Sequence, residues 1–590
     1  MSNLSIGLTD LARPLSFPGK SAPAPQTLPR PIYPRAADQI VQFLVQNGVS
    51  TVFGLPGGPL FPIYDALLDC PSIRVINCKH ETMAVFAAAA YARATESVGV
   101  VLVTSGPGIT NSLTGLASAF CDSLPVLMLA GEVPRSQFGR GALQEGSPYS
   151  LDVRAMVHSI TKATFELTNS RSTGAVMGKA LATARSGRKG PVFVSLPLDV
   201  TPERVDPARI EAQVSSQFTV EAQLLDDVAD LLASADHPLI LAGSGVRWGR
   251  GPEQLLRLAE RGSIPVATTP KAKGVFPESH PLALGIYGYG GHPSTRKYLE
   301  SDVDVLFAVG TGFGEVATNT WNQVIKASRA FVQLDIDAAQ IGKNYRVDVG
   351  LVGPADVVLL KLLERTPKRN RLLVVRGVER FTDPAVSPEA THTPITPQRA
   401  IWELQACLPK DTIYTVDSGE HTMFGLHYLN LDRPDCFYFA GGLGAMGSGL
   451  GSALGVKLGC PTRAVVCICG DGSVPMNGGE LLTCAQQKLP IIVAVINNGG
   501  YGMVENGMNH MYGRSHSFAT APMDICQFAR GLGATAIRIE RPGDILTAGL
   551  EAALGEGRPI VLDIVVDPAV KMPAPERLAA LKASVEEVRS

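Results

Sequence analysis

From about residue 36 the hydrophobic positions follow two alternating spacings. In segments such as residues 37–47 and 81–94, apolar residues recur every three or four positions, which predicts amphipathic helices. Between such segments lie short, continuous apolar runs, such as residues 99–104 and 126–130, which predict strands buried on both faces. Strands that alternate with helices in this way predict parallel sheets covered by helices on both sides.

The alternation is interrupted twice by polar or proline-rich segments, which predicts three α/β domains, each with a doubly wound parallel sheet. A chain of 590 residues agrees with three domains of about 100–200 residues each. The predicted strands are residues 51–53, 73–77, 99–104, 126–130, 191–196, 238–243, 303–309, 331–335, 412–416, 464–468, 491–496 and 560–565. The predicted units are a flexible leader (1–35), a first domain (36–207), a central domain (219–364), a linker (365–393), a third domain (394–568) and a C-terminal arm (569–590) with a final helix at 574–589.

Composition and charge narrow the class of protein. Hydrophobic residues make up 45% of the chain and charged residues 18%, which is ordinary for a globular protein. The net charge of −2 gives no electrostatic reason to expect nucleic acid or an anionic membrane surface as a partner. No run reaches the ~18–20 apolar residues of a membrane-spanning helix. We therefore expect neither nucleic-acid binding nor membrane insertion.

The cysteines and the leader give information about the cellular compartment of the protein. The ten cysteines stand at scattered spacings, without the CxxC pairs or Cys/His clusters of zinc sites. Reduced thiols in a reducing compartment are the simplest interpretation, which predicts a cytoplasmic protein. The leader is rich in proline and favours a flexible arm. Its four basic residues against a single acidic one leave an organelle transit peptide as the alternative.

The strongest chemical signal lies in the third domain. The predicted strand at 464–468 leads into Gly470-Asp471-Gly472-Ser473, where a glycine turn precedes a helix start suited to binding phosphate. Asn498 follows the next strand, 27 residues after Asp471, and offers a second hard oxygen for Mg²⁺. Taken alone, the glycine turn around Asp471 and the turn at Asn498 are each typical of an ordinary turn in an α/β sheet. Together they predict a site for Mg²⁺ and a diphosphate.

This combination resembles the thiamine-diphosphate enzymes, and in particular the acetolactate (acetohydroxyacid) synthase group, from residue 36 to about residue 570. The resemblance implies pyrimidine-binding, central and diphosphate-binding domains. It also implies that Asp471, Asn498 and the main-chain carbonyl of Gly500 hold Mg²⁺. The residues implied to contact the cofactor are Glu81, Ser418, Gly419, Glu420, His421, Gly444, Met446, Gly472, Ser473 and Met503.

Three residues carry implied catalytic roles. In the resembling enzymes a glutamate at the position of Glu81 hydrogen-bonds the pyrimidine ring, and a large apolar side chain at the position of Met446 bends the cofactor. Gln144 matches a glutamine near the reacting carbon. Taken singly, these residues also suit a helix cap, a core methionine and an exposed loop residue. The match around Glu81, from His80 to Asn111, favours catalysis.

The predicted substrate pocket resembles that of the acetolactate synthase group but differs from it at two positions. Its predicted residues are Gly58, Pro59, Leu143, Lys162 and Gly507, although a solvated lysine is nearly as good an interpretation of Lys162. Where the family carries an arginine for the acceptor's carboxylate, this chain has residues 310–315, Gly-Thr-Gly-Phe-Gly-Glu. Gly507 stands where the family has a tryptophan that narrows the acceptor pocket.

These features predict a carboligase, a lyase or transferase, that decarboxylates a 2-oxo acid such as pyruvate and passes the acyl carbanion to an acceptor carbonyl. The acceptor is expected to differ from the standard 2-oxo acid of branched-chain amino-acid synthesis. The alternatives are a simple 2-oxo acid decarboxylase, a flavin-linked oxidase and a catalytically silent homologue. The resemblance implies thiamine diphosphate, Mg²⁺ and a homodimer or homotetramer, and it leaves FAD binding in the central domain open.

Overall fold

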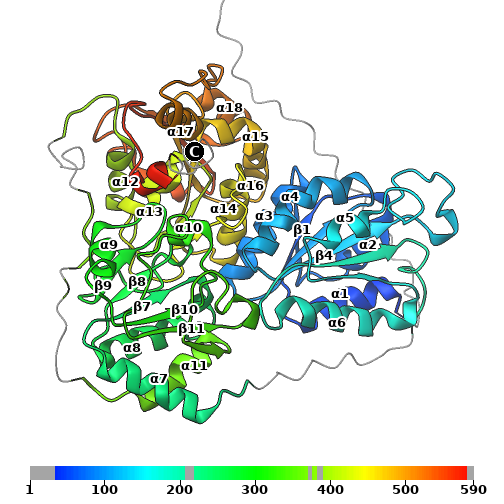
Figure 1. Cartoon of the computed structure of the whole chain (residues 1–590). Helices are drawn as coiled ribbons and strands as arrows, with labels where there is room; N and C mark the ends of the chain where they lie inside the picture. Colours follow the sequence, from blue (N-terminus) through cyan, green and yellow to red (C-terminus); the bar gives the residue numbers. More distant parts are fainter. Residues whose placement is uncertain are drawn as a thin grey trace, which may run out of the picture.

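The computed structural model describes residues 34–205, 218–369, 375, 377–381, 390–580 and 582. These residues form three six-stranded sheets, and all strand pairs within them are parallel. Helices cover both faces of the sheets (Figure 1). The predicted fold class is therefore confirmed. The predicted leader up to residue 33, and residues 581 and 583–590 of the predicted C-terminal arm, lie outside the described residues.

The first sheet has the strand order β2-β1-β3-β4-β6-β5. The chain places β2 on one side of β1 and then returns to place β3 on the other, so the winding reverses between β1 and β3. In parallel sheets, the carboxyl ends of the two strands at such a reversal frame a crevice for ligands. The elements are α1 Ala36–Gln46, β1 Thr51–Gly54, α2 Phe61–Leu68, β2 Arg74–Asn77, α3 Glu81–Ala94, β3 Gly99–Val103, α4 Pro107–Cys121, β4 Val126–Glu132, α5 Val153–His158, β5 Ala163–Glu166, α6 Thr173–Arg185 and β6 Val192–Pro197.

The second sheet has the order β12-β11-β10-β7-β8-β9, with its reversal between β7 and β10. Its elements are α7 Ala222–Ser234, β7 Pro238–Ala242, α8 Gly251–Gly262, β8 Val266–Thr268, β9 Ala283–Ile286, α9 Pro293–Leu299, β10 Val305–Val309, α10 Glu315–Thr318, β11 Ala330–Asp335, β12 Val349–Val352 and α11 Ala355–Arg365.

The third sheet repeats the pattern of the first, in the order β14-β13-β15-β16-β18-β17, and reverses between β13 and β15. Its elements are α12 Pro397–Ala406, β13 Ile413–Val416, α13 Glu420–Tyr428, β14 Phe437–Phe439, α14 Ser448–Gly459, β15 Val465–Gly470, α15 Val474–Asn477, α16 Leu481–Gln486, β16 Ile492–Asn497, α17 Gly502–Tyr512, α18 Ile525–Gly531, β17 Thr535–Ile539, α19 Leu550–Leu554 and β18 Ile560–Val565.

Six strands of the structure were absent from the sequence prediction, namely β5, β8, β9, β12, β14 and β17. Five of them form the outer edges of the sheets, and β8 lies next to an edge. All six are only three to five residues long. Strands β5, β12 and β17 contain exposed or partly exposed residues, so they lack the continuous apolar run that marks the inner strands. Strands β8, β9 and β14 are buried throughout, but their runs of three or four residues are too short to stand out.

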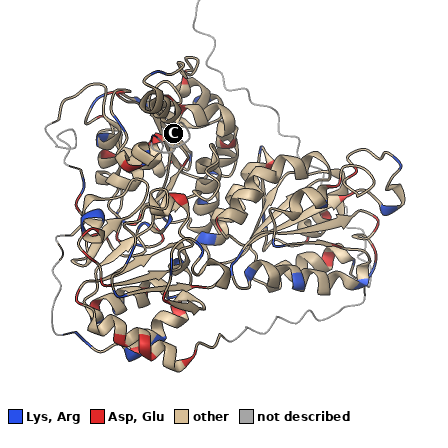
Figure 2. Ribbon diagram, viewed as in Figure 1, with Lys and Arg blue, Asp and Glu red and all other residues tan. Residues whose placement is uncertain are grey.

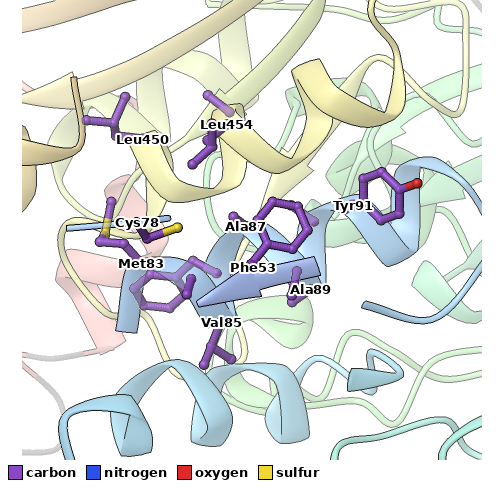
Figure 3. Packing of buried hydrophobic residues seen from close by; sticks show 14 of the residues in the cluster. Phe53, Cys78, Met83, Val85, Ala87, Ala89, Tyr91, Leu450 and Leu454 are labelled. Atoms are coloured by element: carbon purple, nitrogen blue, oxygen red, sulfur yellow. The ribbon is translucent and has the colours of Figure 1, made fainter. Parts of the chain in front are cut away.

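Helices α3 and α14 join the first and third domains. They lie side by side in the same direction, and Figure 3 shows Met83 and Ala87 of α3 facing Leu450 and Leu454 of α14. The contact is close because α14 carries glycine where α3 approaches: a methyl group on Gly455 would lie 1.9 Å from the carbonyl oxygen of Ala87. The tight contact places the amino-terminal ends of both helices next to each other.

Replacing Gly455 by alanine is expected to push these helices apart and to lower the free energy of unfolding by about 1–3 kcal/mol, the usual range for overpacking. Thermal melting followed by circular dichroism measures the effect. Gly531→Ala is the matched control, because no atom lies within 4 Å of a methyl group at that helical position. A helical alanine there should leave stability unchanged or improve it by up to ~1 kcal/mol. Equal melting temperatures for both variants would contradict the close contact.

Charges are spread over the whole molecule. Figure 2 shows Lys and Arg interspersed with Asp and Glu, for example around α7 at the bottom of the view. Among the described residues, no helix combines the length and the apolar character that crossing a membrane requires. The crevices at the three reversals of winding are therefore where a functional site is expected.

Candidate active site

The reversal in the third sheet gathers the predicted diphosphate residues. Strand β13 ends at Val416 and leads through Ser418 and Gly419 into α13, which begins at Glu420. Strand β15 ends at Gly470 and leads into a short turn of 3₁₀ helix at Asp471–Ser473. The two strands are direct neighbours in the sheet, so both loops open at the same crevice.

Asp471 is buried at the carboxyl end of β15, with 6% of its surface exposed. Its Oδ2 accepts a hydrogen bond of 2.8 Å from the hydroxyl of Thr520. Its Oδ1 is buried without a hydrogen-bond partner among the described residues. Burial raises the pKa of Asp471, and the Thr520 hydroxyl opposes this rise. A buried carboxylate oxygen without a partner is costly, and a bound cation would satisfy it.

Asn498 and Gly500 follow β16, the next strand of the sheet, whose Ile496 pairs with Gly470. The backbone N–H of Asn498 lies close enough to Asp471 to lower the pKa of that carboxyl. The side-chain oxygen of Asn498 accepts a hydrogen bond of 3.3 Å from the N–H of Gly500. The structure thus brings the three predicted metal ligands to neighbouring strand ends.

His421 lies against the same turn, since a methyl group on Gly470 would lie 3.2 Å from its Nδ1. Burial lowers the pKa of His421 to about 4, so the ring is neutral at physiological pH. Its Nε2 is buried without a partner among the described residues. A neutral ring nitrogen at a helix start is suited to donating a hydrogen bond to a phosphate oxygen.

Asp417, which the sequence did not single out, ties the two loops of the crevice together. It accepts hydrogen bonds from the N–H of Ser418 at 2.7 Å and from the N–H of Gly447 at 2.9 Å. Burial raises the pKa of Asp417 to about 6. Because Gly447 follows Met446, Asp417 fixes the loop that carries Met446 beside the start of α13.

The remaining predicted cofactor residues lie around this loop and turn. Gly444 lies beside Ser418, since a methyl group on it would come within 3.8 Å of the serine hydroxyl. Gly472 lies beside the ring of Tyr501, the residue that follows Gly500. Met503 lies on α17 and packs, partly buried, against the core of the third domain.

These residues fit Mg²⁺ and a diphosphate. A carboxylate, an amide oxygen and a main-chain carbonyl are the hard ligands that Mg²⁺ takes alongside phosphate oxygens. Asp471 Oδ1 and His421 Nε2 have no hydrogen-bond partner among the described residues. They offer an acceptor for a cation and a nitrogen for an anion at one crevice. The start of α13 adds the partial positive charge of a helix amino terminus.

In the first domain, Glu81 begins α3 and is buried, with 7% of its surface exposed. The ring of His80 caps the helix by accepting a hydrogen bond from the N–H of Thr82 at 3.2 Å. The amide of Asn111 on α4 donates a hydrogen bond of 3.1 Å to Glu81 Oε2. The Glu81 carboxyl, on the helix that follows β2, is therefore oriented by α4, the helix that follows β3. These two strands lie on either side of β1.

The predicted pocket loops of the first domain meet at this same reversal. Gln144, in a left-handed conformation with φ 64°, packs against Gly106 in the turn after β3. Pro59 packs against Gly131 at the end of β4. Space remains around Gly58, where a methyl group would have no atom within 4 Å, and Leu143 is 87% exposed.

Lys162 is not brought to this crevice. It precedes β5 and therefore lies at the amino ends of the strands, the edge opposite to Glu81. Its ammonium group donates hydrogen bonds to the carbonyl oxygens of Thr183 and Ser186, at 2.6 and 2.7 Å. Within the chain its contacts are those of a residue that closes the end of α6. Its assignment to the substrate pocket stays a prediction.

A cavity of about 830 Å³ opens at the reversal in the second sheet. It is bounded by the glycine turn after β7 and by residues 310–317 after β10. Its volume falls in the upper part of the range of about 300–1,000 Å³ for cofactor and small-molecule sites. The basic residues on its wall come from the first and central domains and are Arg93, Arg185, Arg188, Lys189, Arg247, Lys271 and Lys343.

The sequence missed residues that support the predicted ones. Asn111 belonged to the matched stretch but had no assigned role, although its place on the helix after a glycine turn was a usable signal. Thr520 lies in an irregular segment after α17 and gave no pattern to detect. It reaches Asp471 only because residue 519 bridges back to Gly500.

The three domains match those of known proteins. Models of the thiamine pyrophosphate enzymes match residues 34–151 (N-terminal TPP binding domain), 225–362 (central domain) and 417–564 (C-terminal TPP binding domain). The chain is 36% identical over 561 residues to the probable acetolactate synthase large subunit of Methanocaldococcus jannaschii, covering 91% of this chain and 93% of that protein. It is 34% identical over 550 residues to the acetolactate synthase isozyme 3 large subunit of Escherichia coli, covering 90% and 94%.

Proposed function

The chain belongs to the thiamine pyrophosphate enzymes of the acetolactate synthase type, and we propose that it decarboxylates pyruvate or a similar 2-oxo acid and transfers the acyl group to an acceptor carbonyl. The observation that carries the proposal is the buried Oδ1 of Asp471 beside Asn498, which has no hydrogen-bond partner in the described part of the chain. Glu81, oriented by Asn111, lies at the equivalent crevice of the first domain. When bound, thiamine pyrophosphate supplies the nucleophilic carbon and the electron sink that this reaction needs.

The chain's own residues have separate tasks in this proposal. Asp471, Asn498 and the carbonyl of Gly500 hold Mg²⁺, and the starts of the two loops hold the diphosphate. Glu81 exchanges a proton with a ring nitrogen of the pyrimidine, and Asn111 fixes the direction of its carboxyl. The burial of Glu81 keeps bulk water from that proton. Met446 and Gln144 are assigned to shaping the cofactor and to contacting the reacting carbon.

We propose further that the acceptor is not the standard 2-oxo acid. The run at 310–315 supplies no guanidinium, and its one charged residue is Glu315, whose carboxylate accepts a hydrogen bond from the hydroxyl of Tyr289 at 2.5 Å. Losing a bidentate arginine removes a strong partner of a carboxylate, and a nearby negative charge disfavours a second one. Gly507 lies on α17 with no atom within 4 Å of where its side chain would begin.

Gly507→Trp is expected to reduce carboligation with bulky acceptors more than with small ones, because the indole would fill the open space beside α17. The ratio of kcat/KM for a bulky aldehyde to that for a small one is expected to fall by about 10–200-fold, the range for one lost pocket contact. Gly507→Ala is the control for the loss of glycine and should keep the ratio of the unmodified enzyme. A ratio unchanged in the tryptophan variant would place the acceptor elsewhere.

Product analysis tests the proposal as a whole. Cofactor-stripped protein is given pyruvate, thiamine diphosphate, Mg²⁺ and a panel of acceptors, and the products are identified by proton NMR. The expected result is a cofactor-dependent acyloin-type product, formed faster with an aldehyde or ketone than with 2-oxobutyrate. Equal initial rates with all acceptors would remove the basis for an unusual acceptor. Release of free acetaldehyde alone would favour the simple decarboxylase, and untouched pyruvate would call for a panel of other 2-oxo acids.

Two further features belong to the proposal. Cofactor sites of this family form between the first domain of one subunit and the third domain of another, so we propose at least a homodimer, and a homotetramer is compatible with it.

The central cavity has room for FAD, which the sequence left open. The visible spectrum of the purified protein decides this: a flavin band retained through desalting assigns FAD, and a colourless, active protein assigns none.

A further inference from the structure

Glu420 stands between a predicted metal ligand and the helix that borders the predicted acceptor pocket. Its Oε2 accepts a hydrogen bond of 3.3 Å from the side-chain amide of Asn498, and its Oε1 accepts one of 2.7 Å from the amide of Asn506 on α17. Gly502 lies so close that a methyl group on it would be 2.5 Å from Glu420 Oε2 and 2.4 Å from the amide nitrogen of Asn498. The carboxylate is thus clamped in one position.

An ionised carboxylate accepts hydrogen bonds and donates none. It therefore attracts the NH₂ group of Asn498, and the oxygen of that amide must point the other way. In the structure the oxygen accepts a hydrogen bond from the N–H of Gly500, the residue whose carbonyl is another predicted metal ligand. The same property makes the Glu420 side chain unsuited to hold phosphate oxygens, which are also acceptors. Its contacts indicate a role that acts through Asn498 and not through the diphosphate.

We propose that Glu420 is a positioning residue for the metal site: it fixes the Asn498 amide with its oxygen toward Mg²⁺ and links that ligand through Asn506 to α17. The inference rests on the proposed Mg²⁺ site at Asp471 and Asn498. Residues that orient metal ligands through hydrogen bonds typically change metal affinity by about 10–100-fold when they are removed. Because α17 carries Met503 and Gly507, the same clamp ties the position of the predicted acceptor pocket to the metal ligand.

The test compares Mg²⁺ affinity in Glu420→Gln and Glu420→Ala, measured by calorimetry with thiamine diphosphate present. Glutamine keeps one acceptor but places an NH₂ group against one of the two amides, whereas alanine removes both contacts. We expect Mg²⁺ affinity to fall in the order unmodified, glutamine, alanine, with the alanine variant weakened about 10–100-fold. At saturating Mg²⁺ the KM for pyruvate should be that of the unmodified enzyme. Glu505→Gln, on α17 but bonded to the N–H of Phe518, is the matched control and should keep its affinity.

The outcomes separate the inference from the proposal beneath it. If excess Mg²⁺ restores activity in the Glu420 variants, the role in positioning the metal ligand is supported. If Mg²⁺ affinity is unchanged in both variants, or activity stays low at saturating Mg²⁺, the inference is overturned. If the unmodified protein itself binds thiamine diphosphate without Mg²⁺, the proposed metal site fails, and the inference fails with it. Melting curves without ligands verify that each variant is folded.

Discussion

Replacing Glu81 by alanine is expected to lower the rate of pyruvate consumption by roughly 10²–10⁴-fold, the usual contribution of a positioned acid or base. The side chain lies buried at the start of α3, and its carboxyl is oriented by Asn111. Because bulk water has little access to this position, water does not take over the proton transfer in the variant. Proton NMR of the reaction measures the rate. Calorimetry should show that the variant still binds Mg²⁺ and thiamine diphosphate, since the predicted metal ligands belong to the third domain.

Two further variants decide what the Glu81 carboxyl does. Glu81→Gln keeps the shape and a hydrogen bond but cannot take up or release a proton, so its rate should be nearly as low as that of the alanine variant. Glu96→Gln changes a glutamate just beyond the opposite end of the same helix and should leave the rate unchanged. A glutamine variant of full activity would show that Glu81 only positions the cofactor.

The sequence predicted every inner strand except β8 and missed every edge strand except β2. Inner strands such as β3 and β15 are covered on both faces, so nearly every residue is apolar and the run is continuous. Edge strands such as β5 and β17 have one exposed side and partly exposed residues, and their short segments do not differ from loops. The doubly wound arrangement was nevertheless predictable, because inner strands and helices alternate in all three units.

The structure brings predicted site residues together where chemistry and local geometry coincide in a short motif. Asp471 and Asn498 each follow a buried strand, so their meeting at neighbouring strand ends could be inferred from spacing. Lys162 rested on resemblance alone, and its position before β5 puts it at the opposite edge of the sheet. Partners such as Thr520 are set by the path of an irregular segment, which no local pattern encodes.

In both the first and the third domain, the residues with proposed chemical roles lie at the crevice where the winding of the sheet reverses. The loops at the reversal between β1 and β3 approach Glu81, and those at the reversal between β13 and β15 hold Asp471 and His421. Helices α3 and α14 then fix the relation between the two domains through a contact that tolerates no added methyl group at Gly455. Within one chain, the fold therefore fixes the two crevices relative to each other. In the proposed homodimer, the crevice of the first domain of one subunit would meet that of the third domain of another.

Replacing Asp471 by alanine is expected to weaken Mg²⁺ binding by at least about 100-fold, above the upper end of what residues behind the ligands contribute. The carboxylate supplies the only full negative charge among the three predicted ligands, and its Oδ1 has no other partner among the described residues. Binding of thiamine diphosphate should then become insensitive to Mg²⁺, which calorimetry at several metal concentrations measures directly.

Graded variants show whether charge or shape matters at Asp471. Asp471→Asn keeps the hydrogen bond from Thr520 but loses the charge, so it should bind Mg²⁺ nearly as poorly as the alanine variant. Thr520→Val removes only the hydroxyl that orients Oδ2 and should weaken Mg²⁺ by about 10-fold. If Asp471→Ala binds Mg²⁺ as tightly as the unmodified protein, the cation lies elsewhere and the unpartnered oxygen has another use. If metal affinity and activity fall together across the three variants, the same carboxylate that burial leaves unsatisfied is the one that anchors the cofactor.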